Sequence, residues 1–238
     1  MQFYTRTDVH VLKIFREGFF MFSYYGSKSK IVDYYPPPKH KKIIEPFAGS
    51  ARYSLKYWQN DVLLVEKFEK VYKIWNYLQN ATQKDILGLP DIITDLREMN
   101  LSEAEKYLIG YCIGRGSARP RNKCGKFNNW ITDKLRIAND INKIKHWQII
   151  YGDYNDIENT EATWFIDPPY KLQVHGYNCK IDDYTKLAEW CKQRNGQIIV
   201  CENENGDWLP FEPLKKLNGI NKQTTEYIWT NENEHGLF

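Results

Sequence analysis

The chain reads Ile43-Ile44-Glu45-Pro46-Phe47-Ala48-Gly49-Ser50 directly after a basic, polar stretch. An apolar pair followed by an acid and a glycine turn predicts a strand that ends near Glu45 and a helix that contains Tyr53. Gly49 allows the backbone to approach a ligand closely, and the acid can meet a cationic or hydroxyl-bearing group. This strand–turn–helix unit is typical of nucleotide-binding α/β folds, and it also occurs as an ordinary turn in other α/β proteins.

A second strand follows this unit in the sequence. Residues 62–65 form a continuous apolar run that ends at Glu66. An acid at the end of the second strand binds ribose hydroxyls in Rossmann-like folds. The next helix is expected to place Val71, Ile74 and Leu78 on one face. The two units together predict a Rossmann-like α/β domain.

A third stretch carries the chemistry, and it reads Trp164-Phe165-Ile166-Asp167-Pro168-Pro169-Tyr170. The apolar residues predict a buried strand, which the two prolines end and hold rigidly. A planar ring that bears an amine fits here, because the amine donates one hydrogen bond to Asp167 and one to the carbonyl of Pro168 while Tyr170 stacks on the ring. These two bonds localise the nitrogen lone pair and make it nucleophilic. The alternative is an ordinary strand followed by a proline turn.

Composition sets limits on the class of protein. The 238 residues suffice for one substantial core, and 42% hydrophobic and 26% charged residues are ordinary for a soluble globular protein. A net charge of +3 gives no whole-chain argument for nucleic acid, so any such argument must be local. Five cysteines without a Cys-x-x-Cys pair are expected to be reduced, mostly buried thiols of a cytoplasmic protein, not a zinc site. No apolar run reaches membrane-spanning length.

The segment 114–129 is basic and rich in glycine and amides, and it has no acid. Its basic residues are Arg115, Arg119, Arg121, Lys123 and Lys126. Lys and Arg on a flexible loop suit phosphates, and Asn or Arg can read base edges. The segment is therefore a candidate for binding nucleic acid, with a solvated basic loop as the alternative.

Two helices are predicted beside this segment. A capping box at Ser102 opens a helix that runs to about Ile113. The second helix, over 130–147, is expected to place a set of apolar side chains on one side. That set is Ile131, Leu135, Ala138, Ile141 and Ile144.

The remaining predicted elements are helices over 22–35 and 182–194 and strands over 148–151, 164–166, 197–201 and 224–230. Asp182 is expected to cap its helix, and Gly196 is expected to end it. Asp153 and Asp167 follow the strands 148–151 and 164–166. We expect these two strands to be adjacent, so that the two carboxylates line one crevice, where α/β sheets bind ligands.

The motifs, in their order along the chain, resemble those of the DNA adenine methylase (Dam-like) family, the alpha group of amino-methyltransferases. They are Tyr24-Tyr25-Gly26-Ser27-Lys28, Glu45-Pro46-Phe47-Ala48-Gly49-Ser50, Glu66, Gly152-Asp153-Tyr154 and Asp167-Pro168-Pro169-Tyr170. Three positions depart from the family pattern. Ala51 replaces the second glycine of Phe-x-Gly-x-Gly, Ser27 replaces one of two glycines, and Glu66 stands where Asp is commoner.

The resemblance implies a role for each matching residue. Tyr24 and Lys28 would lie at the cofactor and the substrate. Glu66 would bind the ribose hydroxyls, and Asp153, with Tyr154 beside it, would accept from the adenine amine of the cofactor. The residues that would cradle the methionine part of S-adenosylmethionine are Glu45, Pro46, Phe47, Ala48 and Gly49. The catalytic set would be Asp167, Pro168, Pro169 and Tyr170.

We therefore predict a Rossmann-like methyltransferase domain formed by 1–80 and 148–238, with a helical target-recognition insertion at 81–147 and a possible extension at 1–20. The expected reaction transfers a methyl group from S-adenosylmethionine to the N6 amine of an adenine flipped out of double-stranded DNA. The protein is expected to be a monomer or weak dimer of bacterial, archaeal or phage origin, without a membrane partner. Alternatives are a methyltransferase for cytosine, an RNA base or a protein glutamine, a nucleic-acid-binding protein without catalysis, and an unrelated α/β protein.

Overall fold

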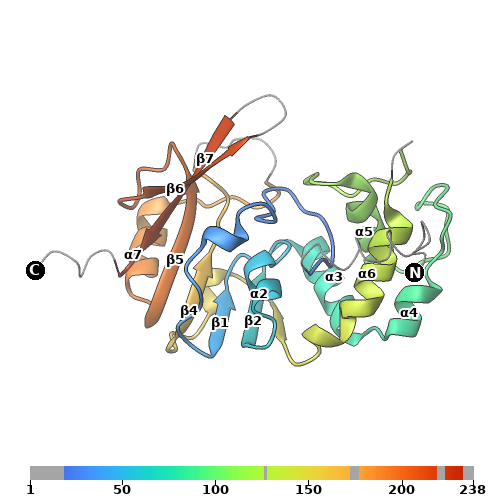
Figure 1. The fold of residues 1–238 in the computed structure, drawn as a ribbon, viewed down its shortest axis with the longest axis horizontal. Helices are drawn as coiled ribbons and strands as arrows, with labels where there is room; N and C mark the ends of the chain where they lie inside the picture. The colour runs from blue at the N-terminus through green and yellow to red at the C-terminus, as the bar shows by residue number, and fades with distance from the viewer. Residues whose placement is uncertain (1–18, 126–127, 172–176, 219–222, 233–238) are drawn as a thin grey trace, which may run out of the picture.

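A computed structural model describes residues 19–125, 128–171, 177–218 and 223–232 (Figure 1). Within them the chain forms one seven-stranded sheet in the order β3-β2-β1-β4-β5-β7-β6. The first five strands in this order are parallel, and β7 runs antiparallel to both of its neighbours. The strands are β1 (Lys42–Glu45), β2 (Asp61–Glu66), β3 (Gln148–Tyr151), β4 (Ala162–Ile166), β5 (Gly196–Asn203), β6 (Glu212–Asn218) and β7 (Gln223–Thr230). The predicted α/β class is confirmed.

The helices lie at different places along the sheet, with α2 near its middle (Figure 1). Figure 1 shows α4, α5 and α6 gathered on one side of the molecule and α7 near β5 on the other. The α-helices are α2 (Arg52–Lys56), α3 (Glu69–Asn80), α4 (Gln83–Gly88), α5 (Glu103–Gly114), α6 (Trp130–Asp140) and α7 (Tyr184–Lys192). The short 3₁₀ turns are η1 (Val32–Tyr34), η2 (Ile141–Ile144) and η3 (Tyr154–Asp156). No described helix is long and apolar enough to cross a membrane.

The central strands are buried on both faces, which explains their uninterrupted apolar sequences. Successive side chains point to opposite faces of a strand. Ile43 of β1 therefore lies in one core cluster and Ile44 in the other. In β4, Phe165 stacks on Tyr53 with ring centroids 4.3 Å apart, while Trp164 packs on Trp190 of α7 across the opposite face. Packing on both faces thus holds the central strands in place, and the carboxyl ends of these strands carry Glu45, Glu66 and Asp167.

The predicted helix over 22–35 is wrong. The structure has turns there, followed only by the 3₁₀ turn η1. Gly26 adopts a left-handed conformation with φ of +73°, and the N–H of Ser27 donates to the carbonyl of Tyr24. A single left-handed residue interrupts the helical hydrogen-bond ladder, so the segment folds as a turn that carries Lys28 inward.

The boundaries of α7 also differ from the prediction. Asp183 caps the helix instead of Asp182, because its carboxylate accepts from the N–H groups of Thr185 and Lys186. The helix ends at Lys192, and Gly196 begins β5 instead of ending the helix. Gly196 has φ of +103°, and a Cβ there would lie 2.2 Å from the carbonyl oxygen of Ala162 on the neighbouring strand.

Helix α6 begins at Trp130 as predicted, but it ends at Asp140, where the 3₁₀ turn η2 follows, and its buried face differs from the prediction. Ala138, Ile141 and Ile144 are buried as expected, whereas Ile131 and Leu135 are 53% and 46% exposed. Trp130 and Ile137 are buried instead, and the indole of Trp130 donates to the carbonyl of Pro90 at 2.7 Å. The large Trp130 ring fixes the rotation of the helix, and this turns the smaller residues outward. Strand β6 was not predicted.

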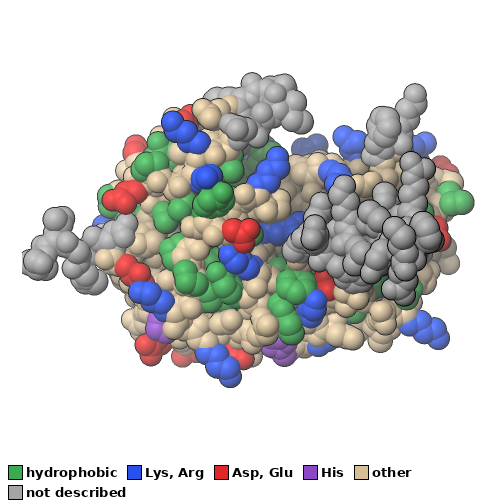
Figure 2. Space-filling model, viewed as in Figure 1, with side chains coloured by type: hydrophobic (Ala, Val, Ile, Leu, Met, Phe, Trp, Pro, Cys, Tyr) green, Lys and Arg blue, Asp and Glu red, His purple; other side chains and the backbone are tan. Residues whose placement is uncertain are grey.

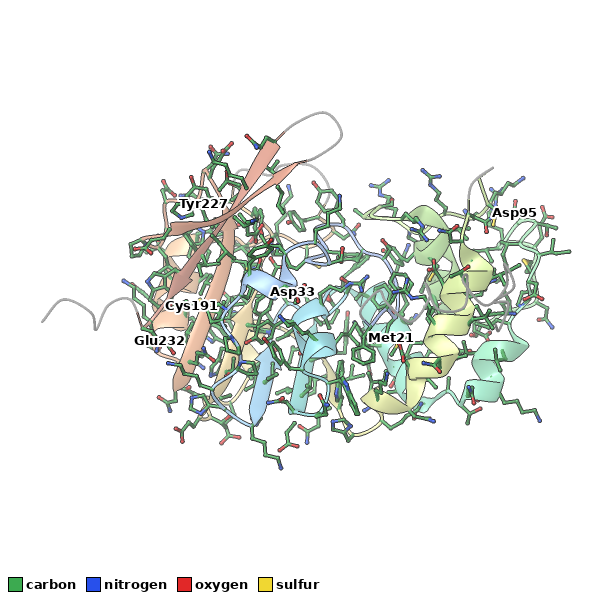
Figure 3. All side chains as sticks on the ribbon, in the orientation of Figure 1. Met21, Asp33, Asp95, Cys191, Tyr227 and Glu232 are labelled. Carbon is green, nitrogen blue, oxygen red and sulfur yellow. The ribbon has the colours of Figure 1, made fainter. Side chains whose placement is uncertain are left out.

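The start of the described chain packs into the protein. Phe20 is buried, and the guanidinium groups of Arg52 and Arg136 lie 5.0 and 4.9 Å from its ring centre. Met21 is fully buried and lies toward the side of α3 and α6, whereas Tyr227 lies on β7 at the other end (Figure 3). Phe19 and Phe20, the last two residues of the predicted extension, thus pack against the domain, and 1–18 lie outside the described residues.

Candidate active site

A cavity of about 290 Å³, here called cavity 1, lies at the carboxyl ends of β1, β2 and β4. The structure brings all the cofactor-binding residues predicted from the sequence to its lining. They are Tyr24, Lys28, Glu45, Pro46, Phe47, Ala48, Gly49, Glu66, Asp153 and Tyr154. Asp167 and Pro169 of the predicted catalytic set line the same cavity. Ligands of α/β proteins bind at this edge of the sheet.

The turn after β1 is held by Glu66. Gly49 has φ of +47°, and its N–H donates to Oε2 of Glu66 at 2.9 Å. Oε1 of Glu66 accepts from the N–H of Phe68 at 2.8 Å, and the carbonyl of Gly49 accepts from the indole of Trp75. Burial raises the pKa of Glu66 to about 7, although these backbone hydrogen bonds oppose the rise. The carboxylate thus fixes the shape of the turn as well as facing the cavity.

Two further acids of cavity 1, Glu45 and Asp153, are already engaged with the protein. Glu45 is buried, and its carboxylate accepts from the N–H of Ser54 at 2.7 Å. Burial raises the pKa of Glu45 to about 8. Asp153 accepts from Nζ of Lys67 at 2.7 Å and from Asn155. Partial burial acts to raise the pKa of Asp153, but these hydrogen bonds outweigh it and the pKa is lowered.

Asp153 and Asp167 line one cavity without lying on adjacent strands. The prediction of adjacency is wrong, since β2 and β1 separate β3 from β4 in the sheet. The crevice is nevertheless shared, because all four strands are parallel and end at the same edge. The sequence shows which strand precedes each acid but not the spatial order of the strands.

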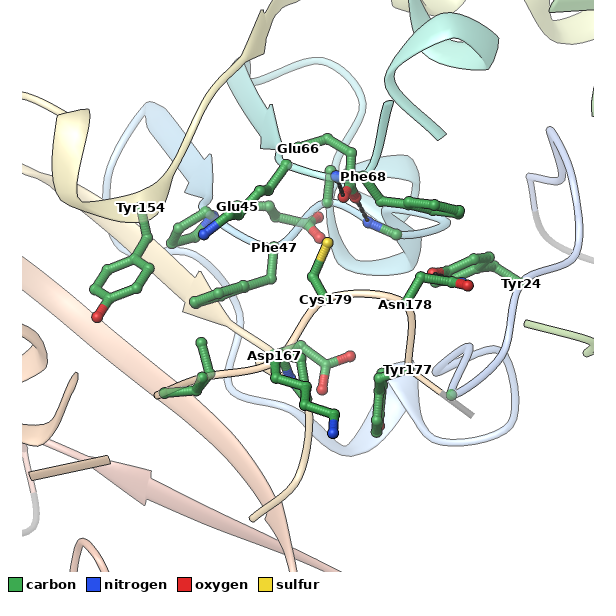
Figure 4. A pocket seen from close by; sticks show the side chains of 18 of the residues that line it. Tyr24, Glu45, Phe47, Glu66, Phe68, Tyr154, Asp167, Tyr177, Asn178 and Cys179 are labelled. Carbon is green, nitrogen blue, oxygen red and sulfur yellow. Dashed lines mark hydrogen bonds between the residues drawn. The ribbon is translucent and has the colours of Figure 1, made fainter. Parts of the chain in front are cut away.

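The segment after Asp167-Pro168-Pro169-Tyr170 adds residues to cavity 1 for which the sequence predicted no role. Tyr177, Asn178 and Cys179 line cavity 1, opposite the residues from β1 and β2. Figure 4 shows Phe47, Cys179 and Asp167 converging on the cavity from three different elements. The sequence signal was only the polar stretch 171–179, of which 172–176, including the histidine at 175, lie outside the described residues.

Asp167 is part of a buried charged cluster. Nζ of Lys28 lies 2.8 Å from Oδ1 of Asp167 and 3.3 Å from Oε1 of Glu226, and it also donates to the hydroxyl of Tyr170. The hydroxyls of Tyr170 and Tyr35 each donate to Oε1 of Glu226 at 2.7 Å. Burial raises the pKa of Asp167 to about 6; the positive charge of Lys28 opposes this rise and the negative charge of Glu226 adds to it. Glu226, on β7, was not assigned from the sequence.

Tyr170 faces a second, larger cavity. This cavity 2 has a volume of about 1140 Å³ and shares Lys28 and Tyr177 with cavity 1. The Tyr170 ring is only 8% exposed, and its centroid lies 6.4 Å from that of Tyr177. Asp167 therefore lines the first cavity and Tyr170 the second, with Lys28 between them. In this arrangement one reactant can lie on each side of the charged cluster.

The basic segment is exposed, and its members face different hollows. Arg115 lines cavity 2 and lies 3.5 Å from Asp133, whereas Arg119 lines a third hollow beside α5. Arg121 and Lys123 are also exposed, and Nζ of Lys123 lies 3.4 Å from the carboxylate of Asp95. Lys126 lies outside the described residues. Figure 2 shows Lys and Arg side chains around the recess near the middle of the view.

The strand order defines the class of fold. A seven-stranded sheet in the order 3-2-1-4-5-7-6, with only β7 antiparallel, is typical of the class I S-adenosylmethionine-dependent methyltransferase fold. No protein-family model matches the chain, and no curated protein matches it.

Several solved structures resemble this fold distantly. The protein yhhF of Escherichia coli, provisionally described as a methyltransferase, is 8% identical with a TM-score of 0.36, over 94% of this chain and 86% of that one. A provisionally described methylase of Haemophilus influenzae is 13% identical with a TM-score of 0.35, over 80% and 78%. The rRNA methyltransferase aviRa of Streptomyces viridochromogenes is 9% identical with a TM-score of 0.35, over 81% and 79%. Similarity at this level supports no conclusion about the chemistry of this chain.

Ala51 occupies a position that favours glycine, so Ala51→Gly should cost much less stability than another buried Ala→Gly substitution. Ala51 has φ of +43° and ψ of +46° at the start of α2. An L-residue there costs about 1–2 kcal/mol, whereas glycine loses about 0.4–1 kcal/mol through its greater freedom in the unfolded chain and about 0.8 kcal/mol with the buried methyl group. The free energy of unfolding, measured by urea denaturation, should therefore stay within about 0.5 kcal/mol of the wild type. Ala81→Gly is the matched control, because Ala81 is also buried but has φ of −68°, and this variant should lose about 1–2 kcal/mol. Equal losses for the two variants would contradict this account.

Proposed function

We propose that the protein transfers a methyl group from S-adenosylmethionine to an exocyclic amine, specifically N6 of adenine in double-stranded DNA. The observation that carries the proposal is the position of Asp167 at the end of β4. Its carboxylate is held by Lys28 at 2.8 Å and lies on cavity 1, while Tyr170 of the same motif lies on cavity 2. A methyl donor in the first cavity and an acceptor entering through the second would meet at this carboxylate.

The residues of cavity 1 fit the proposed cofactor. Its volume is close to the lower end, about 300 Å³, of small-molecule sites. The rings of Phe47 and Tyr154 lie 5.4 Å apart and offer apolar surface for a purine. The carboxylate of Glu66 is at the strand end where ribose hydroxyls bind in this class of fold, and the turn at Gly49 allows close approach. When bound, the cofactor would supply an electrophilic methyl group on its sulfonium.

The chain would act mainly by positioning the acceptor. Lys28 engages Oδ1 of Asp167, which leaves Oδ2 as an acceptor for one hydrogen of the amine. The carbonyl of Pro168 would accept the other hydrogen, and the carbonyl of Pro169 is fixed by the hydroxyl of Tyr184. Withdrawing both hydrogens from the plane of the ring localises the nitrogen lone pair. Correct alignment of amine, methyl and sulfur then contributes more than proton transfer.

Two features support DNA adenine as the acceptor. The motif Asp167-Pro168-Pro169-Tyr170 resembles that of DNA adenine methylases. The basic segment between α5 and α6 is exposed, and Arg115 lines cavity 2 beside the charged cluster. Basic side chains around an acceptor cavity suit a phosphate backbone, and the base would leave the duplex stack at a cost of a few kcal/mol.

The test measures transfer of labelled methyl from S-adenosylmethionine to unmethylated duplex DNA, followed by identification of the modified nucleoside. N6-methyladenine is the expected product. Label in methylcytosine, or label in RNA or protein but not DNA, would replace adenine with another amine acceptor. Binding of the cofactor and DNA without transfer would favour a binding protein, and absence of cofactor binding would remove the methyltransferase assignment.

A further inference from the structure

We propose that Glu226 is a positioning residue of the reacting centre, which orients Tyr170 and shares the ammonium of Lys28 with Asp167. This inference rests on the proposed methyl transfer at Asp167. Glu226 belongs to β7 and is 7% exposed, and it lies 56 positions after Tyr170 in the sequence. Its backbone pairs with Asn203 of β5, so its position is set by the sheet.

Hydrogen bonds from two sides hold the Tyr170 hydroxyl in place. Its hydroxyl accepts from Lys28 and donates to Oε1 of Glu226 at 2.7 Å. Tyr35 donates to the same oxygen at 2.7 Å, so that oxygen accepts from two hydroxyl groups. An aromatic side chain anchored at its far end cannot swing into cavity 2, and its face stays in the place where an acceptor ring would contact it.

Glu226 also changes the charge balance around Asp167. Lys28 is the single cation within this cluster of described residues, and two carboxylates lie within 3.3 Å of its ammonium. If Asp167 were its only partner, the ion pair would be neutral, and the carboxylate would be a weaker acceptor for a third group. The negative charge of Glu226 partly offsets the positive potential of Lys28 at Asp167. The Asp167 carboxylate is therefore a stronger acceptor for the substrate amine. A buried carboxylate without a cationic partner is strongly destabilising, and Lys28 is the cation that lies beside Glu226.

Glu226→Gln separates position from charge, because the amide keeps the shape and an oxygen acceptor for the hydroxyls. We expect kcat to fall by roughly 10- to 100-fold, because loss of the Glu226 charge leaves Asp167 a weaker acceptor for the amine. The KM for S-adenosylmethionine should not change, because Glu226 does not line cavity 1. Tyr35→Phe removes one hydroxyl from Glu226 without touching Lys28 or Asp167, so its loss in kcat should be smaller.

The acid limb of the pH profile provides a readout that loss of packing would not move. The ionisable groups around Asp167 are Lys28, Glu45, Glu226, Glu202, Tyr35, Tyr170, Tyr177 and Cys201. Glu226 raises the pKa of Asp167, so its neutralisation should move the acid limb to lower pH. Glu232→Gln is the matched control, because Glu232 is a surface carboxylate paired with Lys39. It should leave both kcat and the acid limb unchanged.

Carbon-13 NMR titration of the Asp167 carboxyl in the ligand-free protein separates this inference from the proposed function. A lower Asp167 pKa in Glu226→Gln than in the wild type is expected even if no acceptor is methylated. An unchanged titration, or wild-type kcat with an unmoved acid limb, would overturn the role of Glu226. Absence of methyl transfer by the wild type would instead reject the proposed function and leave the NMR comparison to decide on Glu226.

Discussion

Asp167→Ala is expected to lower the rate of methyl transfer by about 10³-fold while cofactor affinity stays close to that of the wild type. The carboxylate would hold the amine in line with the methyl group, and alanine offers no acceptor. Folding should persist, because Lys28 keeps Glu226 and Tyr170 as partners. Single-turnover transfer and calorimetric titration of S-adenosylmethionine measure the two quantities separately.

Asp207→Asn is the matched control, since Asp207 is an exposed acid that pairs with Lys171 next to the motif. Full activity of Asp167→Ala would contradict the proposed role.

The wild type should also lose activity as the pH falls through about 6, where Asp167 takes up a proton and stops acting as a charged acceptor. The sign follows from the active form being the carboxylate, so activity is present above this pKa and lost below it.

Gly49→Val is expected to weaken S-adenosylmethionine binding by about 100-fold, which corresponds to about 2.7 kcal/mol. Gly49 has φ of +47°, a conformation that a β-branched residue rarely adopts. A Cβ at Gly49 would already contact the ring of Tyr24 at 3.4 Å, and the two methyl groups of valine would extend beyond it into the same space. Relaxation of the turn would also separate the N–H of residue 49 from Glu66.

Calorimetric titration of the cofactor measures this effect, and thermal unfolding shows whether the fold survives. Gly88→Val is the matched control, because a Cβ at Gly88 in α4 meets no atom within 4 Å. It should leave the affinity unchanged. Equal affinities for Gly49→Val and the wild type would show that the turn does not approach the cofactor.

Local sequence patterns predicted most of the elements that build the site. The apolar runs before Glu45, Glu66 and Asp167 became β1, β2 and β4, because buried parallel strands need no alternation of polar residues. The capping box at Ser102 opens α5 as expected. Capping and strand periodicity depend on near neighbours, which the sequence displays directly.

Features that depend on contacts across the fold could not be predicted in this way. Glu226 has no motif around it, and its burial beside Lys28 follows from the insertion of β7 next to β5. The exposed face of α6 was assigned wrongly because the packing of Trp130, not the average periodicity, sets its rotation. In the same way, the sequence could not show that two strands lie between those of Asp153 and Asp167.

The insertion of β7 between β5 and β6 has a consequence for the order of folding. The hydrogen bond from Tyr35 to Glu226 joins residues 191 positions apart, one of the longest separations that a chain of this size permits. Contacts of such range form late, since the entropy of closing a long loop must be overcome first. A nascent chain that has already emerged through Tyr170 would still lack β7. We therefore expect the charged cluster to assemble only after translation has passed the last strand.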